Sequence, residues 1–97
     1  AFAHFGTIVF TRKARIGNFF TIYHGCTVGT NDTGEGPEIG DFVSQYSGSH
    51  ILGRCTIGNN SRIAANAVVL DFECGPNCTL AGIPARVVRE HKKEATA

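Results

Sequence analysis

The stretch RCTIGNNSRIAANAVVL (residues 54–70) carries an aliphatic residue at every sixth position, at Ile57, Ile63 and Val69. A strand with one buried face repeats its apolar residues every two positions, and an amphipathic helix repeats them about every 3.6. A period of six fits neither element. The chain is therefore expected to turn regularly between short extended segments.

The same period runs through most of the sequence. Repeats this short cannot each form a hairpin or a helix pair, so they are predicted to be the flat faces of one continuous coil. Three faces close a coil, which predicts that Ile39 stacks on Ile57 and Ile51 on Val69, with neighbouring coils about 4.8 Å apart. The sixth positions hold Ile39, Gln45, Ile51, Ile57, Ile63 and Val69, and an earlier block holds Phe10, Ile16, Ile22 and Val28.

Three features interrupt this period. Gln45 breaks the aliphatic column, and because a buried amide without partners costs about 1–3 kcal/mol, it is expected to form a hydrogen bond. The segment GTNDTGEGPE (residues 29–38) is a loop by composition. The repeat stops after Val69, so residues 71–97 are predicted to form a terminal cap, with VVREHKKEA (residues 87–95) as a short helix or a frayed tail. Residues 1–97 are thus expected to form a single domain.

Length and charge limit the classes of function. A chain of 97 residues with a formal net charge of +1 has no electrostatic signature of a nucleic-acid or anionic-membrane partner. No run approaches the roughly 20 apolar residues of a membrane span, and the first residues lack a signal-peptide pattern, so a soluble cytoplasmic protein is expected. The first residue is Ala1 rather than Met and the repeat starts almost at once, which is consistent with further residues upstream.

The cysteines allow two disulfides or a thiolate metal site around Cys74 and Cys78. Zinc usually takes four ligands, and no second Cys/His pair has finger-like spacing. Cys26 and Cys55 occupy a repeat position that otherwise holds small residues, so buried reduced thiols are favoured and no metal is expected.

The hexapeptide register resembles that of the left-handed parallel β-helix of hexapeptide-repeat acyltransferases, over about residues 4 to 88. The segment Gly82-Ile83-Pro84-Ala85-Arg86 resembles the closing Gly-(Val/Ile)-Pro-Ala-(Arg/Lys) motif of the serine acetyltransferase and polysaccharide O-acetyltransferase groups. The resemblance implies an all-β, left-handed parallel β-helix with a protruding loop, an acetyl-CoA donor, and a homotrimer with active sites between subunits.

The resemblance also assigns site residues. HFGTIVFTRKARIGNFFTIYHGCTVG (residues 4–29) resembles the run of serine acetyltransferases that opens with the active-site histidine, which makes His4 the general base and His24 an acceptor contact. Without the resemblance, a lone histidine near the chain start is more often a solvated or packing residue. The predicted acetyl-CoA contacts are small or capping positions, namely Ser47, Gly48, Ala65, Gly82 and Arg86. Tight corners favour small residues in any case, and an exposed arginine on a cap is common.

The sequence departs from the serine acetyltransferase pattern at the acceptor. Ala3 replaces the usual acidic neighbour of the histidine, and the Arg-His pair that grips serine in that family falls on Glu35-Gly36. The prediction is therefore an O-acetyltransferase acting on a small hydroxylated acceptor, a sugar or saccharide precursor. A noncatalytic hexapeptide-repeat scaffold is the alternative. A carbonic-anhydrase-like site of three histidines is disfavoured, because His4, His24 and His50 are widely spaced.

Overall fold

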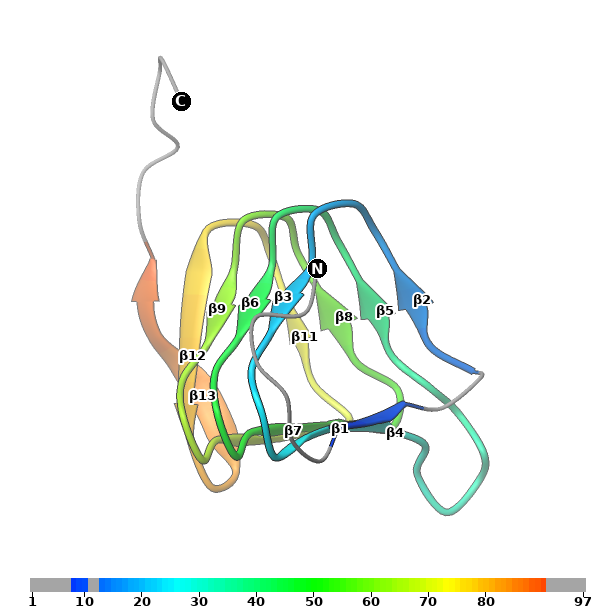
Figure 1. Ribbon diagram of the computed structural model, residues 1–97. Helices are drawn as coiled ribbons and strands as arrows, with labels where there is room; N and C mark the ends of the chain where they lie inside the picture. The colour runs from blue at the N-terminus through cyan, green and yellow to red at the C-terminus, as the bar shows by residue number, and fades with distance from the viewer. Residues whose placement is uncertain (1–7, 11–12, 91–97) are drawn as a thin grey trace.

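A computed structural model describes residues 8–10 and 13–90, with side chains from residue 13 onward, and shows a three-sided coil (Figure 1). Each side is a sheet of parallel strands contributed by successive turns of the chain, and one sheet ends in an added antiparallel strand. Sheet B holds β1 (Ile8–Phe10), β4 (Cys26–Gly29), β7 (His50–Leu52) and β10 (Val68–Leu70). Sheet C holds β2 (Arg15–Ile16), β5 (Glu38–Ile39), β8 (Thr56–Ile57) and β11 (Glu73–Cys74). Sheet A holds β3 (Thr21–Ile22), β6 (Ser44–Gln45), β9 (Arg62–Ile63), β12 (Cys78–Gly82) and β13 (Ala85–Glu90).

The predicted stacking of aliphatic residues is confirmed. Ile39 pairs with Ile57 across β5 and β8, and Ile51 pairs with Val69 across β7 and β10. Their side chains point into the coil and are buried. One bulky apolar side chain per face and per turn therefore fills the interior, which is why the aliphatic period is six.

A second column of inward-facing side chains is formed by the residues two positions before those of the aliphatic column. It holds Val43, Ser49, Cys55, Ser61 and Ala67, all buried. These residues sit where the chain leaves a corner, and the space there accepts only small or medium side chains. The four cysteines lie in the interior as free thiols, which confirms the prediction of buried reduced cysteine.

Gln45 lies at an inward position of sheet A and is fully buried. Its amide nitrogen donates to the carbonyl oxygens of Thr27 and Ser49, each at 3.1 Å, so the expected hydrogen bond is present. Its amide oxygen is the one buried side-chain nitrogen or oxygen in the described part of the chain without a hydrogen-bond partner. Because both partners are carbonyl oxygens, which only accept hydrogen bonds, the NH2 group of the Gln45 amide must face them.

The coil extends two strands further, through β11 and β12, than the sequence predicted. Cys74 stacks on Ile57 and Leu80 stacks on Ile63, so the inward columns continue after Val69. The repeat was hidden because only four residues separate Val69 from Cys74, where five separate Ile51 from Ile57.

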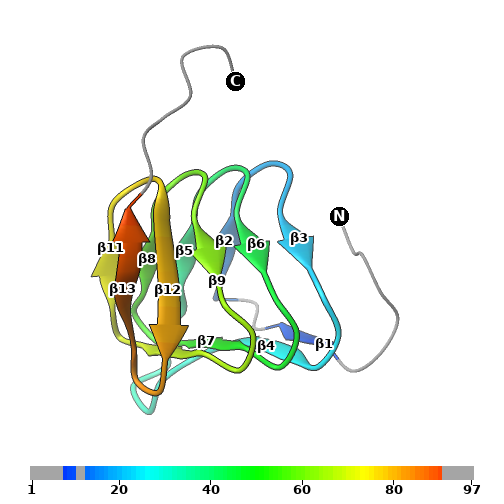
Figure 2. The ribbon, with the colours of Figure 1, turned by 90° about the vertical axis from the view of Figure 1, so that its left-hand side faces the viewer.

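The expected helix or frayed tail after the coil was wrong for the residues that the structure describes. Residues 85–90 form β13, which turns back antiparallel on β12 and covers its open edge (Figure 2). Residues 91–95 of the expected tail lie outside the described part. Among the described residues, no helix long and apolar enough to cross a membrane is found.

Candidate active site

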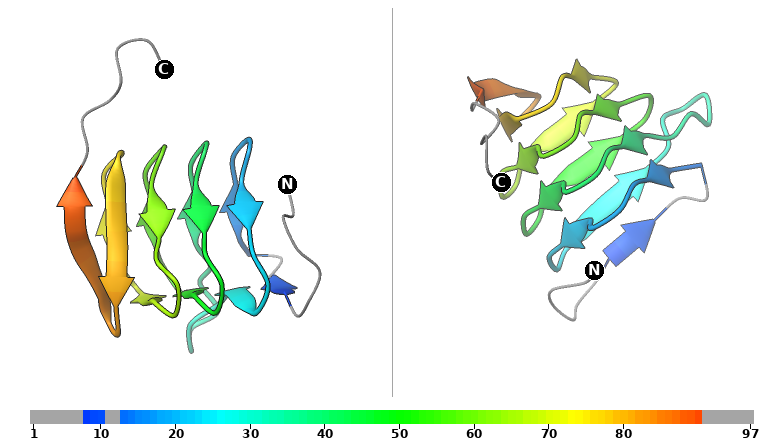
Figure 3. Two further views of the ribbon diagram at one scale, coloured as in Figure 1. Left: turned by 60° about the vertical axis from the view of Figure 1, so that its left-hand side comes forward. Right: turned by 90° about the horizontal axis from the view of Figure 1, so that it is seen from above.

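Five of the predicted site residues line one edge of the coil. This edge, the A-to-B corner, is where the chain passes from sheet A to sheet B, at residues 23–25, 46–49 and 64–67. At the cap end, β12 pairs with β9 and continues to Gly82, and the chain then turns back into sheet A at residues 83–84. Viewed as in Figure 3, these turns follow one another along the coil axis. The predicted residues found there are His24, Ser47, Gly48, Ala65 and Gly82. His4, the predicted base, lies outside the described residues.

The A-to-B corner is tightly packed from turn to turn. Gly48 has φ +73°, a left-handed conformation that favours glycine, and a Cβ there would crowd the side-chain oxygen of Asn66. The amide of Gly48 donates to the carbonyl of His24 at 3.2 Å, and the amide of Asn66 donates to the carbonyl of Ser47 at 3.1 Å. The corner is thus a rigid strip, with Ala65 exposed and Ser47 half-buried.

The strip leads toward the cap and a cluster of arginines. Arg86 lies on β13 opposite Ala81 of β12. The register also places Arg62 of β9 and Arg89 of β13 on either side of Thr79, all on the outer face of sheet A. Arg62 and Arg89 were not predicted as site residues, because the antiparallel pairing of β13, with its irregularity near Thr79, has no repeat signal. An anion at the cap end of sheet A would meet a positive surface.

The predicted loop has a defined structure built on Asn31. Residues 30–37 connect β4 to β5, and the side-chain oxygen of Asn31 accepts the amides of Thr33 and Glu35, each at 3.0 Å. The amide of Asn31 donates to the carbonyl of Glu35 at 3.0 Å. An asparagine that bonds the backbone two and four residues on closes a compact turn. The loop therefore presents fixed side chains rather than a flexible tether.

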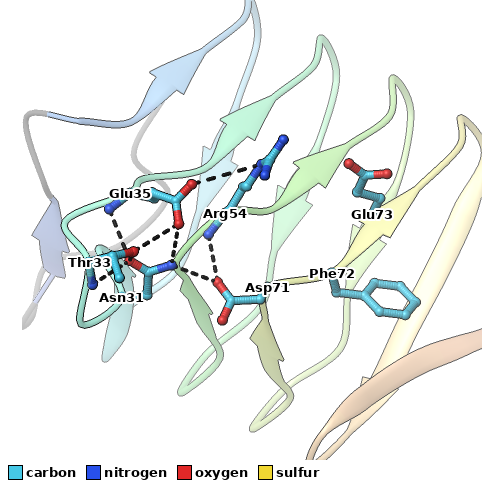
Figure 4. A pocket seen from close by; sticks show the side chains of 7 residues that line it. All are labelled: Asn31, Thr33, Glu35, Arg54, Asp71, Phe72 and Glu73. Carbon is cyan, nitrogen blue, oxygen red and sulfur yellow. Dashed lines mark hydrogen bonds and ion pairs between the residues drawn. The ribbon is translucent and has the colours of Figure 1, made fainter.

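These side chains line an open cleft beside the next two turns, shown in Figure 4. Asn31 Nδ2 lies 3.1 Å from Glu35 Oε1 and 3.0 Å from Asp71 Oδ1, so it links the loop to the coil. Asp71 Oδ1 also accepts the backbone amide of Arg54 at 2.8 Å. The Arg54 guanidinium faces Glu35, with Nε 3.9 Å from Oε2.

Glu35 is one of three exposed carboxylates that line this cleft, together with Asp71 and Glu73. Hydrogen bonds from Asn31 and Thr33 hold the pKa of Glu35 below its usual value, and the charge of Arg54 acts in the same direction. The carboxylate is therefore ionised at neutral pH. Part of its acceptor capacity faces the open cleft, where a ligand hydroxyl or amine could donate to it.

The loop cleft and the A-to-B corner lie on opposite edges of sheet B. The cleft is at the B-to-C corner, residues 30–37, 53–55 and 71–72, and one chain does not bring Glu35 and His24 together. The outer face of sheet B between the two edges carries no Asp, Glu, Lys or Arg in β4, β7 and β10. In residues 8–10 and 13–90, no three His, Cys, Asp or Glu side chains gather so that they could hold a metal ion.

Comparison with known proteins places the coil and its corners in a defined group. Residues 34–71 match the family described as bacterial transferase hexapeptide (six repeats). A serine acetyltransferase of Mycobacterium tuberculosis is 38% identical over 88% of this chain and 38% of its own length. A solved structure of a serine acetyltransferase in complex with CoA superposes with a TM-score of 0.81 and 36% identity, over 90% of this chain and 36% of that one. A serine acetyltransferase of Neisseria gonorrhoeae in complex with serine gives a TM-score of 0.72 at 32% identity, over 87% and 40% of the two chains.

The fold is a left-handed parallel β-helix, as predicted, and residues 34–71 match the hexapeptide-repeat transferase family. The chain is similar to serine acetyltransferases, and the similarity covers nearly all of its coil. The chain spans about two fifths of the length of these relatives.

Proposed function

We propose that this chain is the catalytic β-helix of an acetyl-CoA-dependent O-acetyltransferase that acts on a small hydroxylated acceptor. The observation that carries the proposal is the strip of small residues from Ser47 to Gly82, which follows one edge of a coil that is similar to a CoA-bound serine acetyltransferase. Polar chains of a ligand can approach the backbone closely along such a strip.

The donor is proposed to lie along the A-to-B corner. Its phosphates would meet Arg86 and the neighbouring arginines at the cap, because guanidinium groups bind phosphate well. Its pantetheine arm would pass Gly82 and Ala65 and bring the thioester close to Ser47. Adjacent turns are about 4.8 Å apart, so an extended pantetheine arm could contact Gly82, Ala65 and Ser47 in succession.

The proposed reaction is direct acetyl transfer with His4 as general base. His4 takes the proton of the acceptor hydroxyl while the hydroxyl oxygen attacks the thioester carbonyl carbon. The tetrahedral oxyanion then collapses, the carbon–sulfur bond breaks, and the CoA thiolate takes the proton from His4. The acetyl group ends on the acceptor oxygen as an ester, and no acyl-enzyme forms.

The acceptor is proposed to be a sugar or saccharide precursor rather than serine. Glu35 stands where the resemblance places the arginine that grips serine, and its ionised carboxylate would repel the carboxylate of an amino acid. A sugar hydroxyl can instead donate a hydrogen bond to Glu35. The competing acceptor is serine itself, because the relatives are serine acetyltransferases.

A homotrimer would complete the site. The uncharged outer face of sheet B separates the loop cleft from the A-to-B corner, and exposed apolar area is more readily buried than charged area. If copies pack through this face, the loop edge of one copy can meet the A-to-B edge of the next. The acceptor would then lie between Glu35 of one subunit and the donor strip of another.

The test is thiol release from acetyl-CoA by the full chain, with a panel of sugars and amino acids as acceptors. The His4→Ala variant should turn over about 10² to 10⁴ times more slowly, since a well-placed base contributes that much. His91→Ala serves as the matched control and should leave the rate unchanged. Equal rates for the parent chain and His4→Ala would remove His4 from the mechanism, and acetyl-CoA binding without any turnover would support the scaffold alternative.

A further inference from the structure

Two tyrosine rings stack on the A-to-B corner, beside the proposed path of the donor. Tyr23 follows β3 and Tyr46 follows β6, one turn later. Their ring centroids are 5.2 Å apart and their planes differ by 13°. Tyr46 is 37% exposed and comes immediately before Ser47.

The backbone that carries Tyr46 is held firmly. Its carbonyl oxygen accepts the Ser49 hydroxyl at 2.6 Å and the Cys26 thiol at 3.1 Å, and its amide donates to the carbonyl of Ile63 at 3.0 Å. The amide of Tyr23 donates to the carbonyl of Gln45 at 3.1 Å. The stacked pair is therefore a preformed feature of the coil.

The side chains at this corner change abruptly along the coil axis. The equivalent positions in the next two turns are Ala64 and Ala81. This position therefore holds a tyrosine in two successive turns and an alanine in the following two. The small-residue strip lies on the side toward the cap and the tyrosines lie on the side toward the chain start. If the phosphates of acetyl-CoA bind at the cap, its thioester would lie at the boundary between the tyrosine and alanine turns.

We propose that Tyr23 and Tyr46 form the acceptor platform, on which a pyranose ring stacks through its C–H face. This inference rests on the proposed acetyltransferase function and names the residues that select the acceptor. The acceptor hydroxyl must reach the thioester carbon, and Tyr46 adjoins Ser47, where the thioester lies in that proposal. A flat aromatic surface with a negative face attracts the positive C–H edges of a sugar ring, while the ring hydroxyls remain free at its rim. Serine has no comparable apolar face.

The tyrosines offer a direct measurement, because the sequence contains two tyrosines and no tryptophan. Intrinsic tyrosine emission of the full chain therefore reports on this pair alone. Methyl glucoside and methyl galactoside are the probes, and serine is the comparison ligand. A saturable emission change is expected with at least one glycoside and none with serine. A flat titration with both glycosides would overturn the platform.

Variants separate the platform from simple packing of the corner. Tyr46→Phe keeps the ring face and should bind the glycoside within about threefold of the parent chain, whereas Tyr46→Leu fills the space without an aromatic face and should bind at least about fivefold more weakly. Phe42→Leu is the matched control, because Phe19 and Phe42 form a second exposed stack (centroids 4.9 Å apart) on the corner between sheets C and A. This control should bind like the parent chain. Equal binding by Tyr46→Leu and the parent would contradict the inference.

Kinetics distinguish failure of the inference from failure of the proposed function. For acetyl transfer, Tyr46→Leu should raise KM for the sugar by about fivefold or more and leave KM for acetyl-CoA unchanged. Transfer to sugars at an unchanged KM in Tyr46→Leu would reject the platform and leave the acetyltransferase standing. No transfer to any acceptor would reject the proposed function, while the emission titration would still decide whether the tyrosines bind a sugar. Transfer to serine alone would reject both the platform and the sugar acceptor.

Discussion

Gln45 shows how one residue departs from the repeat without breaking it. The amide nitrogen satisfies two carbonyl oxygens of the corner, yet the amide oxygen is buried without a partner. An unsatisfied buried polar atom costs about 1–3 kcal/mol. The carbonyl of Ser49 also accepts the amide of Thr27 at 3.1 Å, so it would keep a partner if the side chain of Gln45 were replaced.

Replacing Gln45 with isoleucine should therefore stabilise the coil. Gln45→Ile continues the column between Ile22 and Ile63 and removes the unpaired oxygen. The free energy of unfolding in urea is expected to rise by about 1 kcal/mol. Gln45→Ala, which leaves a cavity as well as removing the amide, should instead lower it by about 1–3 kcal/mol. A loss of stability in Gln45→Ile would mean that the two hydrogen bonds outweigh the buried oxygen.

Cys55 should make stability depend on alkaline pH. Burial raises the pKa of the Cys55 thiol above its ordinary value of 9.0. A raised pKa in the folded state stabilises the fold below pH 9, and this contribution is lost as the pH rises through the folded-state value. The urea midpoints of the parent chain and Cys55→Ala should thus differ by a constant amount below pH 9 and converge as the pH rises above 9. A difference between the two midpoints that stays constant above pH 9 would contradict this account.

At the scale of elements, the segment between β4 and β5 was predicted as a loop, and its shape was not. Composition identifies a loop because glycine, proline and asparagine interrupt the repeat. The choice of Asn31 as the hub depends on Asp71, which lies 40 residues away and accepts its side-chain amide. Contacts at that separation leave no local pattern in a single sequence.

The hydrogen bonds of the loop predict the order in which substitutions shift the pKa of Glu35. Asn31→Ala removes the largest cause that lowers it, so the Glu35 pKa should rise toward its ordinary value of 4.5. Arg54→Ala removes only a weaker charge interaction and should raise the pKa less. A lowered pKa stabilises the loop above pH 4.5, and this contribution is lost on acidification. In Asn31→Ala, the stability of the loop should therefore depend less on pH in the acid range. NMR titration of the Glu35 carboxyl carbon measures both shifts, and a larger rise in Arg54→Ala would reverse the proposed order.

For the whole molecule, the sequence predicted the three-sided coil because every inward column repeats locally. The register of Ile39 on Ile57 and of Ile51 on Val69 follows from counting alone. The last turn was missed because a shortened corner shifts Cys74 out of phase, and β13 was missed because antiparallel pairing has no sixfold signal. The candidate site was predicted less completely. The arginines at the cap and the two stacked tyrosines come from different turns of the coil, and only the folded structure brings them together.

The distribution of charged residues over the outer faces of the coil predicts which face forms the contact between subunits. The outer face of sheet C carries Arg15, Glu38 and Glu73. The outer face of sheet B carries no Asp, Glu, Lys or Arg in β4, β7 and β10 and leaves Leu70 51% exposed. Burying a charge in that face without a partner is costly, so Leu70→Glu should dissociate the proposed trimer.

Sedimentation equilibrium should give a mass three times 10.3 kDa for the parent chain and 10.3 kDa for Leu70→Glu. Thr56→Glu places the same charge on the exposed outer face of sheet C and should leave the larger mass unchanged. If the active site lies between subunits, Leu70→Glu should lose acetyl transfer together with the larger mass, while Thr56→Glu retains both. A parent chain that sediments at 10.3 kDa and still transfers acetyl groups would show that one coil is sufficient for catalysis, and the acceptor would then have to bind without the loop of a neighbour.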